Sequence, residues 1–357
     1  MRIRFYQESD QKAWDEFVKR HAQGTFFHLS GWKRVVEDSF GHVSSYLLAE
    51  KEESQTAERQ IGGPDARESI VGVFPLFSIK NFLFGRSMVS VPFATYGGIL
   101  ADNYEIQRAL YHEAVKLTRK QNLDYLEIRN ENSPLPDLPI KNLYFTFKKE
   151  IFPSEEENLK AIPRKTRRMV RLGMAKGLES VWGGEELLEV FYGLFSFSYR
   201  GFGTPVFSKN YLRNLLREFH ESCKILIIYK DGFPLSGVLS FFFRNEVIPY
   251  YSGSYPTSRE YAANDFLYWT LMCIAVERDC RWFDFGRSKK DTGPFHFKKH
   301  WGFTHKPLSY QYYLHKINEL PDISPANPRY NRRIELWKKL PLWLTKLVGP
   351  HIVKYIP

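Results

Sequence analysis

The chain has 357 residues, of which 43% are hydrophobic and 16% aromatic. This size and composition exclude a wholly disordered protein and allow about two domains, each with its own core. Three cysteines are too few for a disulfide framework, and no Cys/His cluster has metal-ligand spacing. We therefore expect reduced thiols and no metal site.

The formal net charge of +11 comes from two segments. Residues 160–176 hold seven basic residues and no acid, and residues 329–354 carry a net charge of +6. Such local basicity is typical of contact with a polyanion or a membrane surface. Because the N-terminus lacks an apolar signal core and no 18-residue apolar run occurs, we expect a cytoplasmic protein, either free or peripheral at the inner membrane.

The first half of the chain predicts two helices and four strands around one polar insertion. In chain order these are helix 32–40, strand 45–49, insertion 51–69, strands 70–79 and 87–93, helix 105–120 and strand 125–129. The longer helix is amphipathic, with apolar residues recurring every third or fourth position. It leads directly into the last strand, which contains Glu127.

The second half repeats this order. It predicts helix 211–220, strand 225–229, a turn at 230–234, strands 235–243 and 247–252, helix 266–278 and strand 282–285. Asn264 or Asp265 is the expected N-cap of the later helix. Glu127 and Asp284 therefore occupy equivalent places, each in the middle of the strand after the long helix.

Two copies of one unit predict a mixed α/β (α+β) fold with tandem duplicated GNAT-like N-acyltransferase domains. We expect an N-terminal domain at 1–150, a C-terminal and catalytic domain at 151–318, and a basic amphipathic tail at 319–357. The order of elements matches the GNAT plan. It does not match a doubly wound nucleotide-binding fold, and neither a GxGxxG nor a GxxxxGK[ST] loop is present.

Several passages resemble the FemAB/FemX-like family of the GNAT superfamily, and in particular FemAB-related proteins of PEP-CTERM/exosortase systems. They are VSVPFATYGGIL at 89–100, IPRKTRR at 162–168, YSGS at 251–254, the aromatic strand and basic loop at 282–303, and the tail at 336–350. The resemblance implies a tandem fold that transfers an acyl group to an amine of a bacterial envelope or exopolysaccharide precursor. In the best-known relatives the donor is aminoacyl-tRNA.

The resemblance also implies a reaction site, and this chain differs from the family pattern at two other places. Phe297 and Lys298 match a Phe-Lys pair that lies at the reaction site of those relatives. Val36 stands where relatives carry a phosphate-contacting lysine, which argues against a nucleotide-linked muropeptide. The pyrophosphate cradle of acyl-CoA-dependent relatives falls at 259–264 without its glycine, which argues against acyl-CoA.

Acyl transfer to an amine needs a donor for the oxyanion and a proton for the leaving group. We expect Lys298 to fill one of these roles, Asp284 to orient or deprotonate the amine through water, and Tyr251 to line the site. Two structural alternatives stay open. For Lys298 the alternative is a solvated lysine on a basic hairpin. For Asp284 it is a strand carboxylate paired with Arg287 or Lys289.

Substrate binding is expected at two places. The Gly286 backbone and the Arg287 side chain can hold a phosphate or carboxylate beside Phe297. Arg164 and Arg168 lie on one face of a helix that begins after Pro163, where they can meet tRNA phosphates or an anionic glycan precursor. The alternative is that this face is only solvated.

The tail alternates Trp and Leu with Lys at helical spacing, and Pro341 interrupts it. This composition is typical of an interfacial helix on anionic lipid, through residues 334–348, and the alternative is packing on the second domain. Three functions remain open: an envelope N-acyl or aminoacyl transferase, a non-catalytic GNAT-fold protein that binds a partner, polyanion or membrane, and an acyl-CoA-dependent N-acetyltransferase. No resident cofactor is expected. The sequence does not identify the acyl donor, which is aminoacyl-tRNA or acyl-CoA, the amine acceptor or the oligomeric state.

Overall fold

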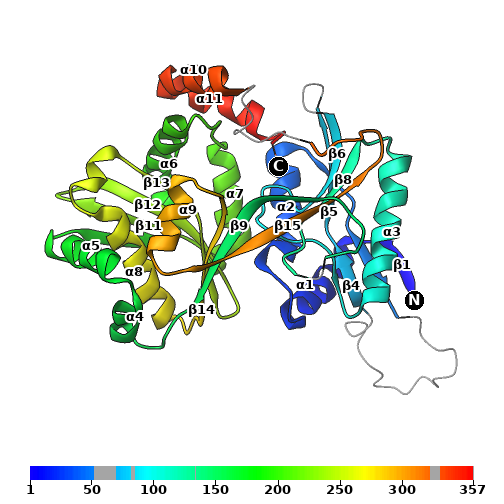
Figure 1. Cartoon of the computed structure of the whole chain (residues 1–357), viewed down its shortest axis with the longest axis horizontal. Coiled ribbons are helices and arrows are strands. Elements are labelled where there is room, and N and C mark those ends of the chain that lie inside the picture. Colours follow the sequence, from blue (N-terminus) through cyan, green and yellow to red (C-terminus); the bar gives the residue numbers. More distant parts are fainter. Residues whose placement is uncertain (52–69, 82–84, 133, 322–329, 357) are drawn as a thin grey trace. The chain divides into compact units, whose positions relative to one another are not determined.

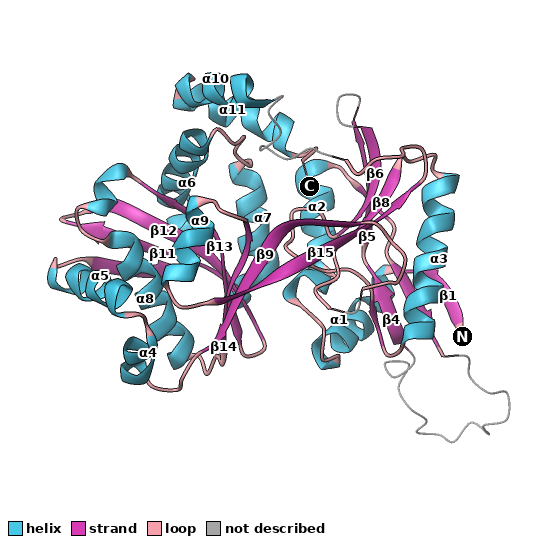
Figure 2. Ribbon diagram, in the orientation of Figure 1, coloured by secondary structure: helices cyan, strands magenta, loops and turns pink. Residues whose placement is uncertain are grey.

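A computed structural model describes residues 1–51, 70–81, 85–132, 134–321 and 330–356. The chain forms two compact units (Figures 1 and 2). Unit 1 comprises Met1–Asn142, Leu308–Asp322 and Tyr355–Pro357, and unit 2 comprises Leu143–Pro307 and Ile323–Lys354. All but the first residue of the polar insertion expected at 51–69 lies outside the described residues.

Unit 1 holds three helices and two sheets among its described residues. Its elements are β1 (Arg2–Phe5), α1 (Gln11–Arg20), α2 (Gly31–Phe40), β2 (Val43–Ser44), β3 (Leu47–Glu50), β4 (Ile70–Phe74), β5 (Leu76–Asn81), β6 (Gly85–Ser90), β7 (Leu100–Ala101), α3 (Tyr104–Lys120), β8 (Tyr125–Ile128) and β15 (Thr304–Leu314). One sheet has the order β1-β3-β4-β7, and the other has the order β15-β8-β6-β5-β2. The core packs Leu110 and Ala114 of α3 with Leu126 and Ile128 of β8.

Unit 2 is built on one sheet with the order β10-β11-β12-β13-β14-β9. Its elements are β9 (Ile140–Glu150), α4 (Glu155–Ala161), α5 (Arg164–Ala175), β10 (Glu179–Gly183), α6 (Leu188–Phe202), α7 (Lys209–Phe219), β11 (Cys223–Lys230), β12 (Phe233–Phe243), β13 (Glu246–Ser254), α8 (Ala263–Glu277), β14 (Trp282–Lys289), α9 (Gly293–His300), α10 (Asn331–Lys339) and α11 (Leu342–Val353). The tail expected at 319–357 supplies α10 and α11, which belong to unit 2.

Helices cover both faces of the unit 2 sheet (Figure 1). Successive side chains of a strand point to opposite faces, and on β13 Tyr251 meets Phe195 of α6 while Ser252 is hydrogen-bonded by Tyr268 of α8. α8 is apolar on nearly every side because it lies between the sheet and α5. This buried helix and its apolar cluster hold the preceding and following strands, β13 and β14, in place.

The predicted duplication appears in the order of elements. α2, β3, β4 with β5, β6, α3 and β8 follow one another in unit 1 as α7, β11, β12, β13, α8 and β14 do in unit 2. In unit 1 β6 runs parallel to β8, and in unit 2 β13 runs parallel to β14, so each parallel pair is joined through the long helix. Most ladders of the described strands are antiparallel, so these parallel pairs mark equivalent places in the two units.

Three sequence expectations differ from the structure. The N-cap of α8 is Ala262 and not Asn264 or Asp265, because the chain enters the helix through a left-handed residue with φ 51°. The basic loop after the aromatic strand is largely regular, since β14 continues to Lys289 and α9 begins at Gly293. Strands β9 and β15 were not expected, and each pairs with a strand of the other half of the chain.

These two strands exchange places between the halves of the chain. β9 follows the first series in sequence, yet residues 144–150 pair with β14 of unit 2. β15 follows the second series, yet residues 311–314 pair with β8 of unit 1. Each unit is therefore completed by a strand that the other half of the sequence supplies, and the predicted boundary at residue 150 falls at the end of β9.

Candidate active site

The parallel pairing of β13 with β14 in unit 2 is short. Only Glu246 with Trp282 and Val247 with Phe283 are opposite each other. Asp284 is the first residue of β14 beyond this pairing, and among the described strands β14 then pairs only with β9, on its other side. Ends of parallel strands are where α/β proteins place ligands, because backbone groups there are free to meet them.

Asp284 is completely buried, with an exposed fraction of 0%. Its Oδ1 accepts the Gly286 N–H at 2.7 Å and the Thr146 hydroxyl of β9 at 3.5 Å. Its Oδ2 has no hydrogen-bond partner among the described residues. Burial raises the pKa of Asp284 to about 7, while the Gly286 N–H and the charge of Lys298 act in the opposite direction. Oδ2 is thus a carboxylate oxygen poised to take up a proton near neutral pH.

A turn of the backbone makes this arrangement possible. Gly286 has φ 62°, which glycine adopts without strain, and the ladder between β14 and β9 is irregular between Asp284 and Arg287. The turn directs the Gly286 N–H back to the carboxylate and exposes three consecutive carbonyl oxygens to one side.

Lys298 lies on α9 and directs its ammonium group onto those carbonyls. Nζ donates to the oxygens of Phe285 at 2.6 Å, Gly286 at 3.2 Å and Arg287 at 3.0 Å, and it lies 5.6 Å from the centre of the Phe147 ring. Burial lowers the pKa of Lys298 to about 7, Asp284 raises it, and Arg287 lowers it. The side chain is half-buried, so Lys298 is not a solvated lysine of a surface hairpin.

Asp284 and Lys298 thus form a coupled acid and base, each close enough to shift the pKa of the other. No ion pair joins Asp284 to Arg287 or Lys289 in the described part of the chain. Two titratable groups whose pKa values are brought to neutrality by burial are a common feature of acid–base sites. The structure therefore brings together Lys298 and Asp284, the two residues to which the sequence analysis gave roles in acyl transfer.

Replacing Asp284 by Asn tests this coupling directly. The substitution removes the charge that raises the pKa of Lys298, so the pKa of the lysine should fall below about 7. The measurement is an NMR titration of ¹⁵N-lysine-labelled protein, with Asp291→Asn on the adjacent exposed turn as control. An unchanged or raised Lys298 pKa in Asp284→Asn, with the control equal to wild type, would contradict the coupling.

The proposed binding residues near this pair have different surroundings. The guanidinium of Arg287 lies 4.8 Å from the centre of the Tyr144 ring on β9. Phe297 packs its ring against Tyr268 of α8 and Trp301, at 5.4 Å and 6.2 Å between ring centroids. Phe297 therefore anchors α9 to α8, which sets the position of the neighbouring Lys298.

Tyr251 lies within an aromatic cluster on the α6 and α7 side of the sheet. Its hydroxyl shares a 3.1 Å hydrogen bond with the hydroxyl of Tyr211, and its ring meets Phe195 and Phe207. Burial raises the pKa of Tyr251 well above its usual value. Among the described residues, no hydrogen bond or ring contact joins Tyr251 to Asp284 or Lys298.

The basic helix is α5, which begins at Arg164 as expected from Pro163. Arg164 and Arg168 are exposed, while Thr166 and Val170 of the same helix are buried. The Thr166 hydroxyl donates to the His300 carbonyl at the end of α9, at 2.7 Å. The exposed arginines thus stand on a helix that is hydrogen-bonded to the helix carrying Lys298.

Unit 1 has a counterpart of Asp284 with a different partner. Glu127 is the third residue of β8, as Asp284 is of β14. Its carboxylate accepts the Arg129 Nε at 2.7 Å, and both side chains are buried, at 6% and 2% exposed. Arg129 also donates to the Ala94 carbonyl at 3.0 Å and lies over the Tyr310 ring. The charge of this acid is therefore balanced by an arginine, whereas Asp284 has no arginine partner in the described part of the chain.

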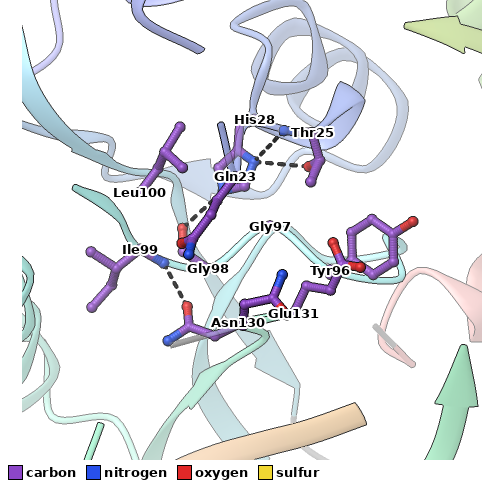
Figure 3. Close-up of a pocket in the computed structure, with 11 residues that line it drawn as sticks. Gln23, Thr25, His28, Tyr96, Gly97, Gly98, Ile99, Leu100, Asn130 and Glu131 are labelled. Atoms are coloured by element: carbon purple, nitrogen blue, oxygen red, sulfur yellow. Dashed lines mark hydrogen bonds between the residues drawn. The ribbon is translucent and has the colours of Figure 1, made fainter. Parts of the chain in front are cut away.

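A pocket also occurs in unit 1, beside the passage 89–100 (Figure 3). Its polar groups bond mainly to one another. The His28 ring contacts the Thr25 hydroxyl at 2.8 Å and the Gly98 carbonyl at 3.3 Å, and Asn130 Oδ1 accepts the Ile99 N–H at 2.8 Å. These bonds fix the glycine-containing loop, so the recess has a structural explanation.

Two neighbours of the site were missed in the sequence. Thr146 contacts Asp284, and the buried Ser288 hydroxyl has no hydrogen-bond partner in the described residues. Ser288 follows Asp284 by four residues on the same strand. Thr146 lies on β9, whose aromatic and polar residues alternate at 145–148, and this short period of two was the available signal.

Part of the chain matches a known domain family. Residues 159–299 match the acetyltransferase (GNAT) domain family. This range contains α5, Asp284 and Lys298, and it covers less than half of the chain. No curated protein matches the sequence.

Similar solved structures span nearly the whole chain. FemX superposes with a TM-score of 0.68 at 17% identity, covering 88% of this chain and 98% of FemX. L-PGS from Bacillus licheniformis gives a TM-score of 0.54 at 12% identity and covers 96% and 98% of the two chains. A tandem GNAT protein from the clavulanic acid biosynthesis pathway gives 0.51 at 12% identity and covers 88% and 98%. The chain has a mixed α/β tandem GNAT fold, as predicted.

Proposed function

We propose that the protein is an N-acyltransferase whose reaction site lies in unit 2, around Asp284 and Lys298. The observation that carries the proposal is the buried acid–base pair at the end of the β13–β14 pairing, within the range that matches a GNAT domain. In a structural ion pair both carboxylate oxygens are expected to have partners. Oδ2 of Asp284 has none among the described residues, and a general base needs such an oxygen to accept a proton.

The chemistry that fits the pair is aminolysis of an activated acyl group. The acceptor amine attacks the acyl carbon, a C–N bond forms, and the bond from that carbon to the donor oxygen or sulfur breaks. Asp284 takes the proton that the amine loses, and the Lys298 ammonium stabilises the oxyanion or protonates the leaving group. One of the three lysine N–H groups must turn from a backbone carbonyl towards the substrate for this step.

We further propose aminoacyl-tRNA as the donor and an amine of an envelope or exopolysaccharide precursor as the acceptor, at the cytoplasmic face of the inner membrane. The FemAB-like passages, including those of PEP-CTERM/exosortase-associated relatives, support this finer assignment, and FemX is among the similar structures. The exposed arginines of α5 offer a basic face for tRNA phosphates near α9.

The start of α8 argues against acyl-CoA. Ala262 occupies the glycine position of the pyrophosphate cradle, so a Cβ stands where that motif has a bare backbone. Asp265 lies in the first turn of the helix, where a carboxylate competes with a bound pyrophosphate for the same N–H groups and dipole. Burial raises the pKa of Asp265 to about 6, so this residue is still largely charged at neutral pH.

The experiment that tests the proposal compares two labelled donors. Purified protein and a fraction of envelope precursors are incubated with radiolabelled aminoacyl-tRNA or radiolabelled acetyl-CoA, and labelled precursor is counted. We expect transfer from aminoacyl-tRNA, and we expect Arg164→Glu/Arg168→Glu to lower kcat/KM for it by about tenfold or more. The matched control is Arg2→Glu/Lys12→Glu, which reverses two exposed charges in unit 1.

Each other outcome has a definite meaning. Transfer from acetyl-CoA alone would overturn the donor and make the protein an N-acetyltransferase. No transfer from either donor, with folded protein that still binds tRNA or precursor, would favour a non-catalytic binding protein. One observation supports the non-catalytic alternative. Lys298 donates three hydrogen bonds to backbone carbonyls, which a lysine with a purely structural role would also do.

A further inference from the structure

The tail helices α10 and α11 pack against α6 and the loop that follows it, all within unit 2 (Figure 1, red). Ile334 lies so close to Gly203 that a Cβ added at residue 203 would be 2.4 Å from the Ile334 side chain. Gly349 lies against the backbone of Val206. The Lys346 ammonium lies 5.2 Å from the centre of the Tyr192 ring. One side of the tail is therefore held by the protein.

The other side of the tail exposes large apolar side chains. Trp343 and Leu347 of α11 are 67% and 61% exposed, and Leu336 of α10 is 63% exposed. Trp343 and Leu347 are four residues apart and share a face of the helix, whereas Thr345 and Gly349 are buried on the opposite face. Packing on α6 thus leaves an apolar face without cover in the described structure.

Basic residues flank this apolar face. The described residues 330–356 contain six Lys and Arg and a single acid, Glu335. Arg332, Arg333 and Lys339 are exposed on α10. The described helices include none long and apolar enough to cross a bilayer. Exposed Trp and Leu on short helices rich in Lys and Arg are typical of segments that lie in a membrane interface.

We propose that α10 and α11 dock unit 2 onto the surface of an anionic lipid bilayer. Trp343 and Leu347 enter the boundary between headgroups and acyl chains, and the α10 cations contact the anionic headgroups. Charge decides for a lipid surface over a second copy of this chain, because two such basic faces would repel each other. Packing on α6 orders both helices before they meet the bilayer, which lowers the entropic cost of docking. The inference does not depend on the proposed function.

The test uses the full chain and co-sedimentation with vesicles. We expect wild-type protein to bind vesicles of phosphatidylglycerol mixed with phosphatidylcholine and to bind pure phosphatidylcholine weakly. Trp343→Ser/Leu347→Ser should lower the partition coefficient about tenfold or more, and Arg332→Glu/Arg333→Glu should remove the preference for the anionic vesicles. Phe233→Ser is the matched control, because Phe233 is an apolar side chain of unit 2 that is 74% exposed at the start of β12.

Thermal unfolding shows whether the variants fold, and these exposed positions should leave it unchanged. Equal binding of both vesicle types, or wild-type binding by Trp343→Ser/Leu347→Ser, would overturn the proposal. A shift of the monomer–dimer equilibrium by the same double variant, with vesicle binding intact, would assign the face to a second copy of the chain.

Discussion

Replacing Lys298 by Met lowers kcat for acyl transfer by about a hundredfold to a thousandfold, which is the loss expected when one donor to a developing oxyanion is removed. Methionine keeps an unbranched apolar side chain at this position, without the ammonium group that lies 5.6 Å from the centre of the Phe147 ring. It removes the ammonium group that reaches the backbone at 285–287. The measurement is single-turnover transfer from whichever labelled donor the comparison of aminoacyl-tRNA and acetyl-CoA selects, with KM measured separately.

Lys299→Met is the control for this substitution. Lys299 is the next residue of α9 and is exposed, so its loss should change neither kcat nor KM. Wild-type kcat in Lys298→Met would contradict a catalytic role and leave Lys298 as a clamp for the Gly286 turn. Because a clamp also predicts lower stability, urea unfolding of both variants separates a folding defect from a chemical one. A kcat loss in protein that unfolds at the wild-type urea concentration supports the catalytic role.

The sequence predicts those parts of the fold that depend on local pattern. The amphipathic helix expected at 105–120 is α3, and the break expected at Pro341 separates α10 from α11. Strands β9 and β15 were not predicted, because their partner strands lie more than 100 residues away in sequence. Periodicity identifies which face of a strand is buried, but it carries no information on which distant strand completes the ladder.

The candidate site was predicted in its residue types and not in its geometry. Lys298 and Asp284 follow from the resemblance and from the repeated strand. That the lysine stands on a helix and meets three carbonyls depends on the φ of Gly286 and on the packing of Phe297 against Tyr268. Both are tertiary features. The N-cap of α8 was missed for a related reason, since Ala262 adopts a backbone conformation that its residue type does not suggest.

The equivalence of Glu127 and Asp284 was predicted, and its chemical consequence was not. Arg129 is two residues from Glu127 and directly follows β8, and its side chain pairs with the Glu127 carboxylate. Asp284 has Gly286 at the corresponding position. The change from Arg to Gly frees a carboxylate oxygen and lets the backbone turn towards Lys298. A difference of one residue type thus separates a structural acid from a candidate catalytic one.

Replacing Arg129 in unit 1 gives the largest expected loss of stability. Arg129→Met leaves the buried Glu127 carboxylate without its partner, which destabilises proteins by about 3–5 kcal/mol when a buried ion pair is broken on one side. The Ala94 carbonyl also loses a hydrogen bond. Urea unfolding should show this loss, and hydrogen exchange should locate it in β6, β8 and α3 of unit 1.

Two matched variants distinguish the buried pair from a general effect of losing an arginine. Arg86→Met removes an exposed arginine from the neighbouring strand β6 and should change the free energy of unfolding by less than about 0.5 kcal/mol. Glu127→Gln/Arg129→Met removes both charges, so it should recover part of the loss caused by Arg129→Met alone. If Arg129→Met unfolded like wild type and instead abolished acyl transfer, Arg129 would belong to the reaction machinery. Unit 1 would then share in the chemistry that we propose for unit 2.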